Sequence, residues 1–93
     1  MRLKAHEILA VKEAVSRLDP EARVCLFGSR VRDDRKGGDI DILIFSQHLT
    51  YDHKILLRKL LEKSLGERKI DILLARDTQE PFVQIALEEC VWL

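Results

Sequence analysis

The feature that most constrains this 93-residue chain is a glycine–serine pair followed, after nine residues, by two closely spaced aspartates. Short apolar runs beside turn residues predict strands, so one strand should end at the glycine and a second should begin at the aspartates. Because side chains alternate along a strand, both carboxylates should project from the same face. In chain order the parts are the run 24–27, Gly28, Ser29, Asp39, Asp41 and the run 42–45.

The two aspartates enter what should be a buried strand. Asp39 and Asp41 begin the face that Leu43 and Phe45 continue, whereas the isoleucines at 40, 42 and 44 line the other face. A carboxylate in an apolar layer is costly unless it is paired or bound to metal. Mg²⁺ prefers one or two carboxylates and completes its octahedron with phosphate oxygens and water. The pattern therefore indicates a site for a metal-bound phosphate.

A third carboxylate lies in another apolar run. Residues 69–75 are rich in β-branched and apolar residues and predict a strand, with Asp71 inside it. Asp71 has two interpretations, a further ligand of the same site or a buried salt-bridge partner. Three acidic residues on two predicted strands, after a strand that ends at Gly-Ser, favour the first.

These residues resemble the minimal nucleotidyltransferases of the DNA polymerase beta-like superfamily. The resemblance covers nearly the whole chain, and the motifs that carry it are Gly28-Ser29-Arg30, Gly38-Asp39-Ile40-Asp41 and Ile70-Asp71-Ile72. It implies the nucleotidyltransferase fold and the transfer of a nucleoside monophosphate, such as AMP from ATP, to a hydroxyl.

The resemblance also implies roles for individual residues. Gly28, Ser29 and Arg30 would bind the nucleoside triphosphate. Catalysis and the binding of Mg²⁺ would fall to the three carboxylates, Asp39, Asp41 and Asp71. Asp71 would also help to deprotonate the incoming hydroxyl.

Only about twenty residues follow the last predicted strand, so the acceptor should come from outside. The resemblance implies a HEPN-type helical protein as partner in a toxin–antitoxin pair, in which the transferase, as antitoxin, attaches AMP to the toxin. Two alternatives remain open at this stage. In the first, the chain is a non-catalytic antitoxin that neutralises its partner by contact. In the second, it is a catalytic subunit that modifies a small molecule with a separate binding subunit.

The bulk composition limits the classes of partner that we expect. Sixteen basic and sixteen acidic residues cancel, so no net charge attracts nucleic acid or an anionic membrane, and nucleic acid is not expected as a direct substrate. Near-zero net charge favours self-association, so a homo-oligomer is possible. Cys25 and Cys90 lie on apolar segments and predict buried free thiols, which suits a cytoplasmic protein. No apolar run has the ~18 residues of a membrane-spanning helix.

The coarse pattern predicts a single domain over residues 1–93, of α+β class, in which helices flank a small mixed β-sheet. Strands are predicted at 23–27, 39–45 and 69–75, and helices at 4–18, from Thr50 or Asp52 to about Leu65, and at 80–91. In the second helix the residues predicted to face inward are Ile55, Leu56, Leu60 and Leu61; in the third, Phe82, Ile85, Ala86 and Glu89 share a helical spacing.

Overall fold

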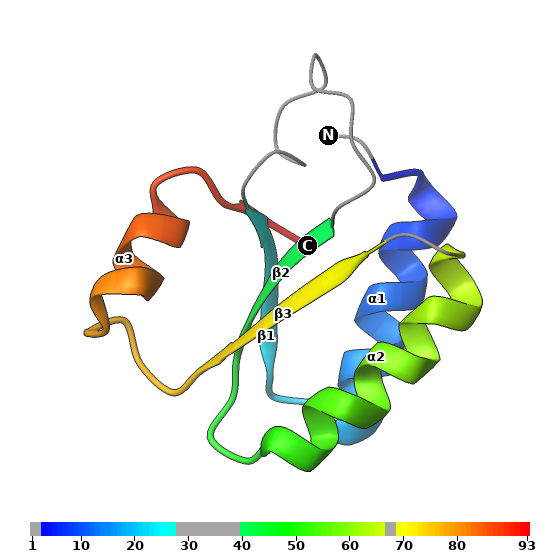
Figure 1. The fold of residues 1–93 in the computed structure, drawn as a ribbon, viewed down its shortest axis with the longest axis horizontal. Helices are drawn as coiled ribbons and strands as arrows, with labels where there is room; N and C mark the ends of the chain where they lie inside the picture. The colour runs from blue at the N-terminus through cyan, green and yellow to red at the C-terminus, as the bar shows by residue number, and fades with distance from the viewer. Residues whose placement is uncertain (1–2, 28–39, 67–68) are drawn as a thin grey trace.

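The computed structural model describes residues 3–27, 40–66 and 69–93 (Figure 1). Within these residues the chain forms three helices and a four-stranded mixed sheet, which confirms the predicted α+β class. No helix among them is both long enough and apolar enough to cross a membrane. The elements in order are α1 (Ala5–Leu18), β1 (Arg23–Phe27), β2 (Ile40–Phe45), α2 (Tyr51–Leu65), β3 (Ile70–Ala75), α3 (Pro81–Leu87) and β4 (Val91–Trp92).

The sheet has the strand order β3-β2-β1-β4. β1 pairs antiparallel with both β2 and β4, whereas β2 and β3 are parallel. A parallel pair needs a crossover, which α2 provides. β2 and β1 are therefore paired on both sides and form the two inner strands of the sheet.

The two faces of the sheet are covered separately. The even-numbered residues of β2 and β3 belong to the larger core, which α1 and α2 cover from one side. The odd-numbered residues face α3 and form a smaller cluster around Leu43 and Val83. Figure 1 shows α1 and α2 side by side, with α3 across the sheet from them.

The C-terminal segment differs from the prediction of one helix over 80–91. α3 ends at Leu87, and Val91 and Trp92 form the edge strand β4. Pairing with β1 satisfies backbone groups of a strand edge that would otherwise be left open, and this outweighs a further helical turn. The Trp92 ring also packs on Phe45, with 5.7 Å between the ring centroids.

The rotation of α2 also differs from the prediction. Ile55 and Leu56 were expected to face inward, but they are 42% and 45% exposed. The inward row consists instead of Leu57, Leu61 and Leu65, which are spaced four residues apart. The predicted inward positions of Leu61, fully buried, and Leu60, partly buried against the larger core, are confirmed. Residues four apart lie on nearly the same side of a helix, so α2 carries more than one row of apolar side chains. Packing against the sheet determines which of these rows is buried.

Adjacent leucines on α2 allow a matched test of this rotation. Leu57→Ala removes a fully buried side chain and should lower the free energy of unfolding by about 2–5 kcal/mol. Leu56→Ala, the control at a half-exposed position, should change it by less than about 1 kcal/mol. Urea unfolding followed by circular dichroism measures both, and equal losses would contradict the rotation described here.

A buried polar contact joins the end of α1 to the end of β2. The Ser46 hydroxyl donates to Asp19 Oδ2 at 2.5 Å and accepts from the backbone N–H groups of His48 and Leu49, each at 3.0 Å. The N–H of Glu21 donates to the other Asp19 oxygen at 3.0 Å. Chiefly because of the bond from Ser46, the pKa of Asp19 lies below its usual value. Asp19 and Ser46 thus tie the two turns at this end of the sheet together.

Ser46→Ala should raise the pKa of Asp19 toward its usual value and destabilise the fold at neutral pH. A carboxyl whose folded pKa is depressed stabilises the protein above its unfolded pKa, about 3.9, and loses this contribution as the pH falls through the folded value. The destabilisation should therefore shrink below about pH 4. Unfolding by urea across pH 3–7 and NMR titration of the Asp19 carboxyl carbon check this. Ser16→Ala is the control, because Ser16 is exposed and its hydroxyl donates within its own helix, to the Lys12 carbonyl. An equal pH dependence in both variants would contradict the role of Ser46.

Candidate active site

Asp41 and Asp71 are brought side by side in the structure. They are Cα partners across the parallel strands β2 and β3, so their backbones are separated by the usual strand spacing of about 4.8 Å. Both are odd-numbered members of strands whose other odd positions face α3, and both side chains are partly exposed. The structure thus brings together two of the three predicted carboxylates, from two strands that are distant in the sequence.

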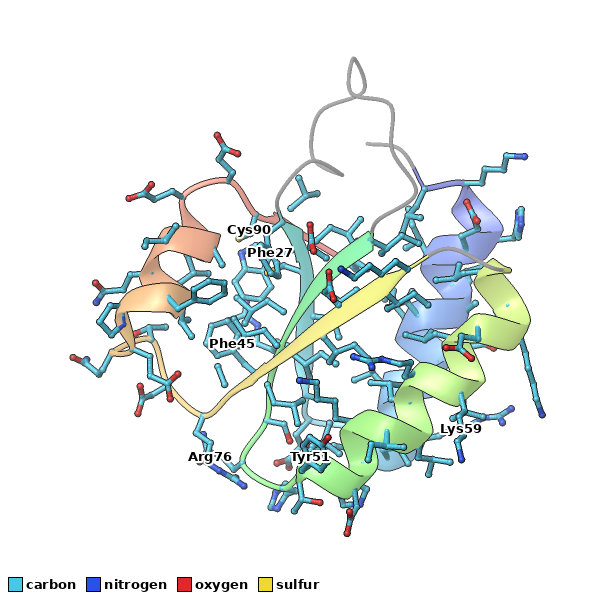
Figure 2. All side chains as sticks on the ribbon, in the orientation of Figure 1. Phe27, Phe45, Tyr51, Lys59, Arg76 and Cys90 are labelled. Atoms are coloured by element: carbon cyan, nitrogen blue, oxygen red, sulfur yellow. The ribbon has the colours of Figure 1, made fainter. Side chains whose placement is uncertain are left out.

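The end of β1 lies at the same edge. Phe27, its last residue, is the Cα partner of Asp41. Phe27 packs against the cluster beneath α3 together with Cys90, and Figure 2 shows both near this end of the sheet. Arg76 and Tyr51 lie at the opposite end.

Several predicted site residues lie outside the described part of the chain. The expected glycine turn and the first aspartate of the motif fall there, so their side chains are not placed. These residues are Gly28, Ser29, Arg30 and Asp39. The described residues next to them in sequence, Phe27 and Ile40, belong to the strands that meet at the carboxylate edge.

Lys69 is a member of the site that the sequence interpretation missed. Its Nζ lies 3.9 Å from Asp71 Oδ2, and the two side chains are 69% and 47% exposed. Asp71 therefore has an ion-pair partner, as its alternative interpretation proposed, but the pair is solvated rather than buried. An exposed pair of this kind contributes little to stability, about 0–1 kcal/mol. The sequence did contain a signal for this pair, because Lys69 and Asp71 are two residues apart and alternate residues of an extended segment lie on the same side.

The chemistry of this edge favours a divalent cation. Like charges directly opposite each other on neighbouring strands are destabilising, and Asp41 and Asp71 occupy such positions. Lys69 brings a single positive charge to the pair. Carboxylate oxygens are the ligands that Mg²⁺ prefers, so these two residues fit the ion. Over the described ranges no group of three histidine, cysteine or acidic side chains is close enough to hold a metal, and Asp39, the third predicted ligand, is not among them.

The fully buried thiol on β1, Cys25, does not add a reactive group. Cys25 and Cys90 are both free, as predicted, although only Cys25 is fully buried and Cys90 is half-buried. Burial, together with the neighbouring Cys90 thiol, raises the pKa of Cys25 to about 12. Cys25 therefore remains a neutral thiol at physiological pH, and the site depends on oxygen and nitrogen groups.

Comparison with known protein families finds a match over most of the chain. The model of the nucleotidyltransferase domain family matches residues 8–93, which include every helix and strand described above except the first turn of α1. A comparison with curated proteins finds no match.

The paired carboxylates predict distinct effects on nucleotide binding. Asp41→Asn should abolish Mg²⁺-dependent binding of ATP, because it removes a proposed ligand of the ion that accompanies the triphosphate. Asp71→Asn, on the neighbouring strand, should retain binding within a few-fold, because Asp71 is expected to serve a second ion and the attacking hydroxyl, and the ion that accompanies the triphosphate keeps its other ligands. Asp52→Asn, an exposed aspartate on α2, is the control and should behave as the wild type. Isothermal titration calorimetry with ATP, with and without Mg²⁺, measures each; unchanged binding by Asp41→Asn would contradict the assignment.

Proposed function

The chain belongs to the nucleotidyltransferase domain family, and we propose that it transfers AMP, or another nucleoside monophosphate, from a Mg²⁺-bound triphosphate to a hydroxyl of a partner protein. The partner proposed is a HEPN-type helical toxin, with this chain acting as its antitoxin. The observation that carries the proposal is the juxtaposition of Asp41 and Asp71 at the sheet edge where β1 ends. A module that only binds a partner gains nothing from two opposed carboxylates.

The site residues divide the reaction between them. Asp41 and Asp71, with Asp39, are the residues proposed to hold Mg²⁺, which when bound neutralises phosphate charge and favours departure of pyrophosphate. Gly28, Ser29 and Arg30 are proposed to hold the phosphates. Catalysis of this kind consists mainly of positioning and charge stabilisation.

The proposed transfer step balances as follows. The acceptor hydroxyl oxygen forms a bond to the α-phosphorus, and the bond from that phosphorus to the bridging oxygen breaks. Pyrophosphate leaves with the bonding electron pair. The hydroxyl proton passes to the Asp71 carboxylate and then to solvent. Asp71 is suited to this task because nearly half of its side chain is exposed and an incoming hydroxyl can reach it.

Exposure also supports a macromolecular acceptor. Asp71 and Lys69 are both open to solvent at the edge of the sheet, where a hydroxyl on another protein's surface can approach them. The resemblance to the minimal nucleotidyltransferases supports the toxin–antitoxin pairing, and the family match supports nucleotidyl transfer in general.

The proposed function is tested by incubating the chain with Mg²⁺ and each labelled triphosphate, with and without the protein encoded beside it. A nucleotide adduct on that protein, located by mass spectrometry, is expected with the wild type. Asp71→Asn should lower the transfer rate by at least ~100-fold, the range for loss of a general base, while nucleotide binding persists. Asp52→Asn should transfer at the wild-type rate.

The remaining outcomes separate the alternatives. Equal transfer by the wild type and Asp71→Asn would contradict the role given to Asp71 and leave it as an ion-pair residue. Neutralisation of the partner without any adduct would show a binding module instead. Transfer only to a small molecule would show a catalytic subunit for another class of acceptor.

A further inference from the structure

The outer side of α3 is an apolar surface with no covering element among the described residues. The helix buries Val83 and Ala86 against the sheet. Phe82 and Ile85, three residues apart, are 58% and 64% exposed. Side chains at this spacing are neighbours on a helix, so they form one continuous ridge.

A hollow lies beside this ridge and extends to the last residue of β1. It has a volume of about 280 Å³ and is lined by Phe27, Phe82, Ile85, Ala86, Glu88 and Glu89. Phe27 is also the Cα partner of Asp41, so the floor of the hollow and the carboxylate edge share a residue. The volume lies at the lower end of the roughly 300–1,000 Å³ of pockets for small ligands, so the hollow has room for a few side chains of another protein.

The charge of this part of the chain is one-sided. Residues 77–93 contain four acidic residues and no lysine, arginine or histidine. The chain has sixteen acidic and sixteen basic residues in all, so residues 1–76 carry sixteen basic against twelve acidic, a balance of +4, and residues 77–93 carry −4. All four acidic residues are exposed, and they are Asp77, Glu80, Glu88 and Glu89. Glu80 directly precedes α3, and Glu88 and Glu89 line the hollow, so acidic side chains stand at both ends of the ridge.

From the ridge, the hollow and the one-sided charge, we propose that the outer face of α3 docks a cationic amphipathic helix of the partner protein. Apolar side chains of that helix would fill the hollow between Phe27 and Ile85, and its lysines or arginines would face Glu80 and Glu88. An amphipathic helix seated in an apolar groove, with charges matched around it, is a common mode of recognition. The purpose of the surface rests on the proposed function, because docking here brings an acceptor to the carboxylate edge.

A second copy of the chain is the competing occupant. α2 exposes Ile55 and Leu56 among basic residues, so it has the complementary chemistry. However, α2 and α3 cover opposite faces of the sheet (Figure 1). A contact between them would be head-to-tail, and such contacts form rings or open filaments instead of a closed pair. A different protein fits the surface better.

The probe for this surface is a fluorescent synthetic peptide of about 18 residues, with leucines at helical spacing and lysines on both flanks. Fluorescence anisotropy should show binding that weakens as salt rises. Ile85→Gln, at an exposed position where the fold is not at risk, should weaken binding by at least ~10-fold, and Glu88→Gln by a few-fold. Leu56→Gln on α2 is the control for loss of an exposed apolar side chain and should leave binding unchanged. A peptide with glutamates in place of the lysines should not bind.

NMR amide shifts on titration locate the contact. Changes confined to α3, residues 88–90 and Phe27 would support the proposal. No binding of the lysine peptide, equal binding by Ile85→Gln, or shifts on α2 would overturn it. Light scattering of the chain alone gives a further test. Oligomers that the wild type forms and that Ile85→Gln does not form would overturn the proposal, because a second copy would then occupy the surface. Binding of the peptide does not depend on nucleotide transfer, so a failure of the docking proposal would not contradict the proposed function. Loss of Mg²⁺-ATP binding in Asp41→Asn tests the proposed function alone.

Discussion

The central strand β2 sets the limits within which the rest of the structure is arranged. It pairs with β1 on one side and β3 on the other, and both of its faces are covered over most of its length. A charged side chain can therefore stay hydrated only at its ends. Asp41 stands near the first end, on the side that α3 leaves partly open, while Leu43, two residues further on the same face, is fully buried. Desolvation of the carboxylate thus fixes where this strand can carry a charge.

The parallel pairing of β2 with β3 places a second carboxylate beside Asp41. One register makes Asp41 and Asp71 partners and makes Ile42 and Ile72 partners. A slip by one residue would turn the isoleucines of β3 away from the α1–α2 core and place Asp71 in it. The packing of the larger core therefore specifies the juxtaposition of the carboxylates. Burial of the isoleucines, worth roughly 1.5–3 kcal/mol each, stabilises this register, and Lys69 adds a positive charge beside Asp71.

The sequence was sufficient for features that depend on local periodicity. The alternation in β2 correctly separated the face of Ile42 from the face of Leu43, and the ends of α1 and α2 were predicted to within one residue. Features that depend on a distant partner were not predictable in this way. Nothing local to Val91 and Trp92 indicates an open edge on β1, and α2 presents more than one apolar row, so only the sheet selects Leu57 over Leu56. The sequence indicated that Asp71 joins the same site as Asp41, but not that the two are direct partners, because that depends on the parallel register of β2 and β3.

The early end of α3 affects both the pairing of β1 and the charge near the candidate site. A helix continuing to residue 91 would leave no strand to pair with β1. Instead the chain turns at Glu88 and Glu89, and the half-buried Cys90 leads into β4 beside the buried Cys25. The turn keeps two carboxylates near Phe27, at the end of the sheet where Asp41 and Asp71 lie. Acidic groups around a site that is proposed to bind a triphosphate would repel that substrate unless cations intervene. A cationic partner on α3 would lower that negative potential, so docking of the acceptor and binding of the nucleotide would favour each other by the same electrostatic term.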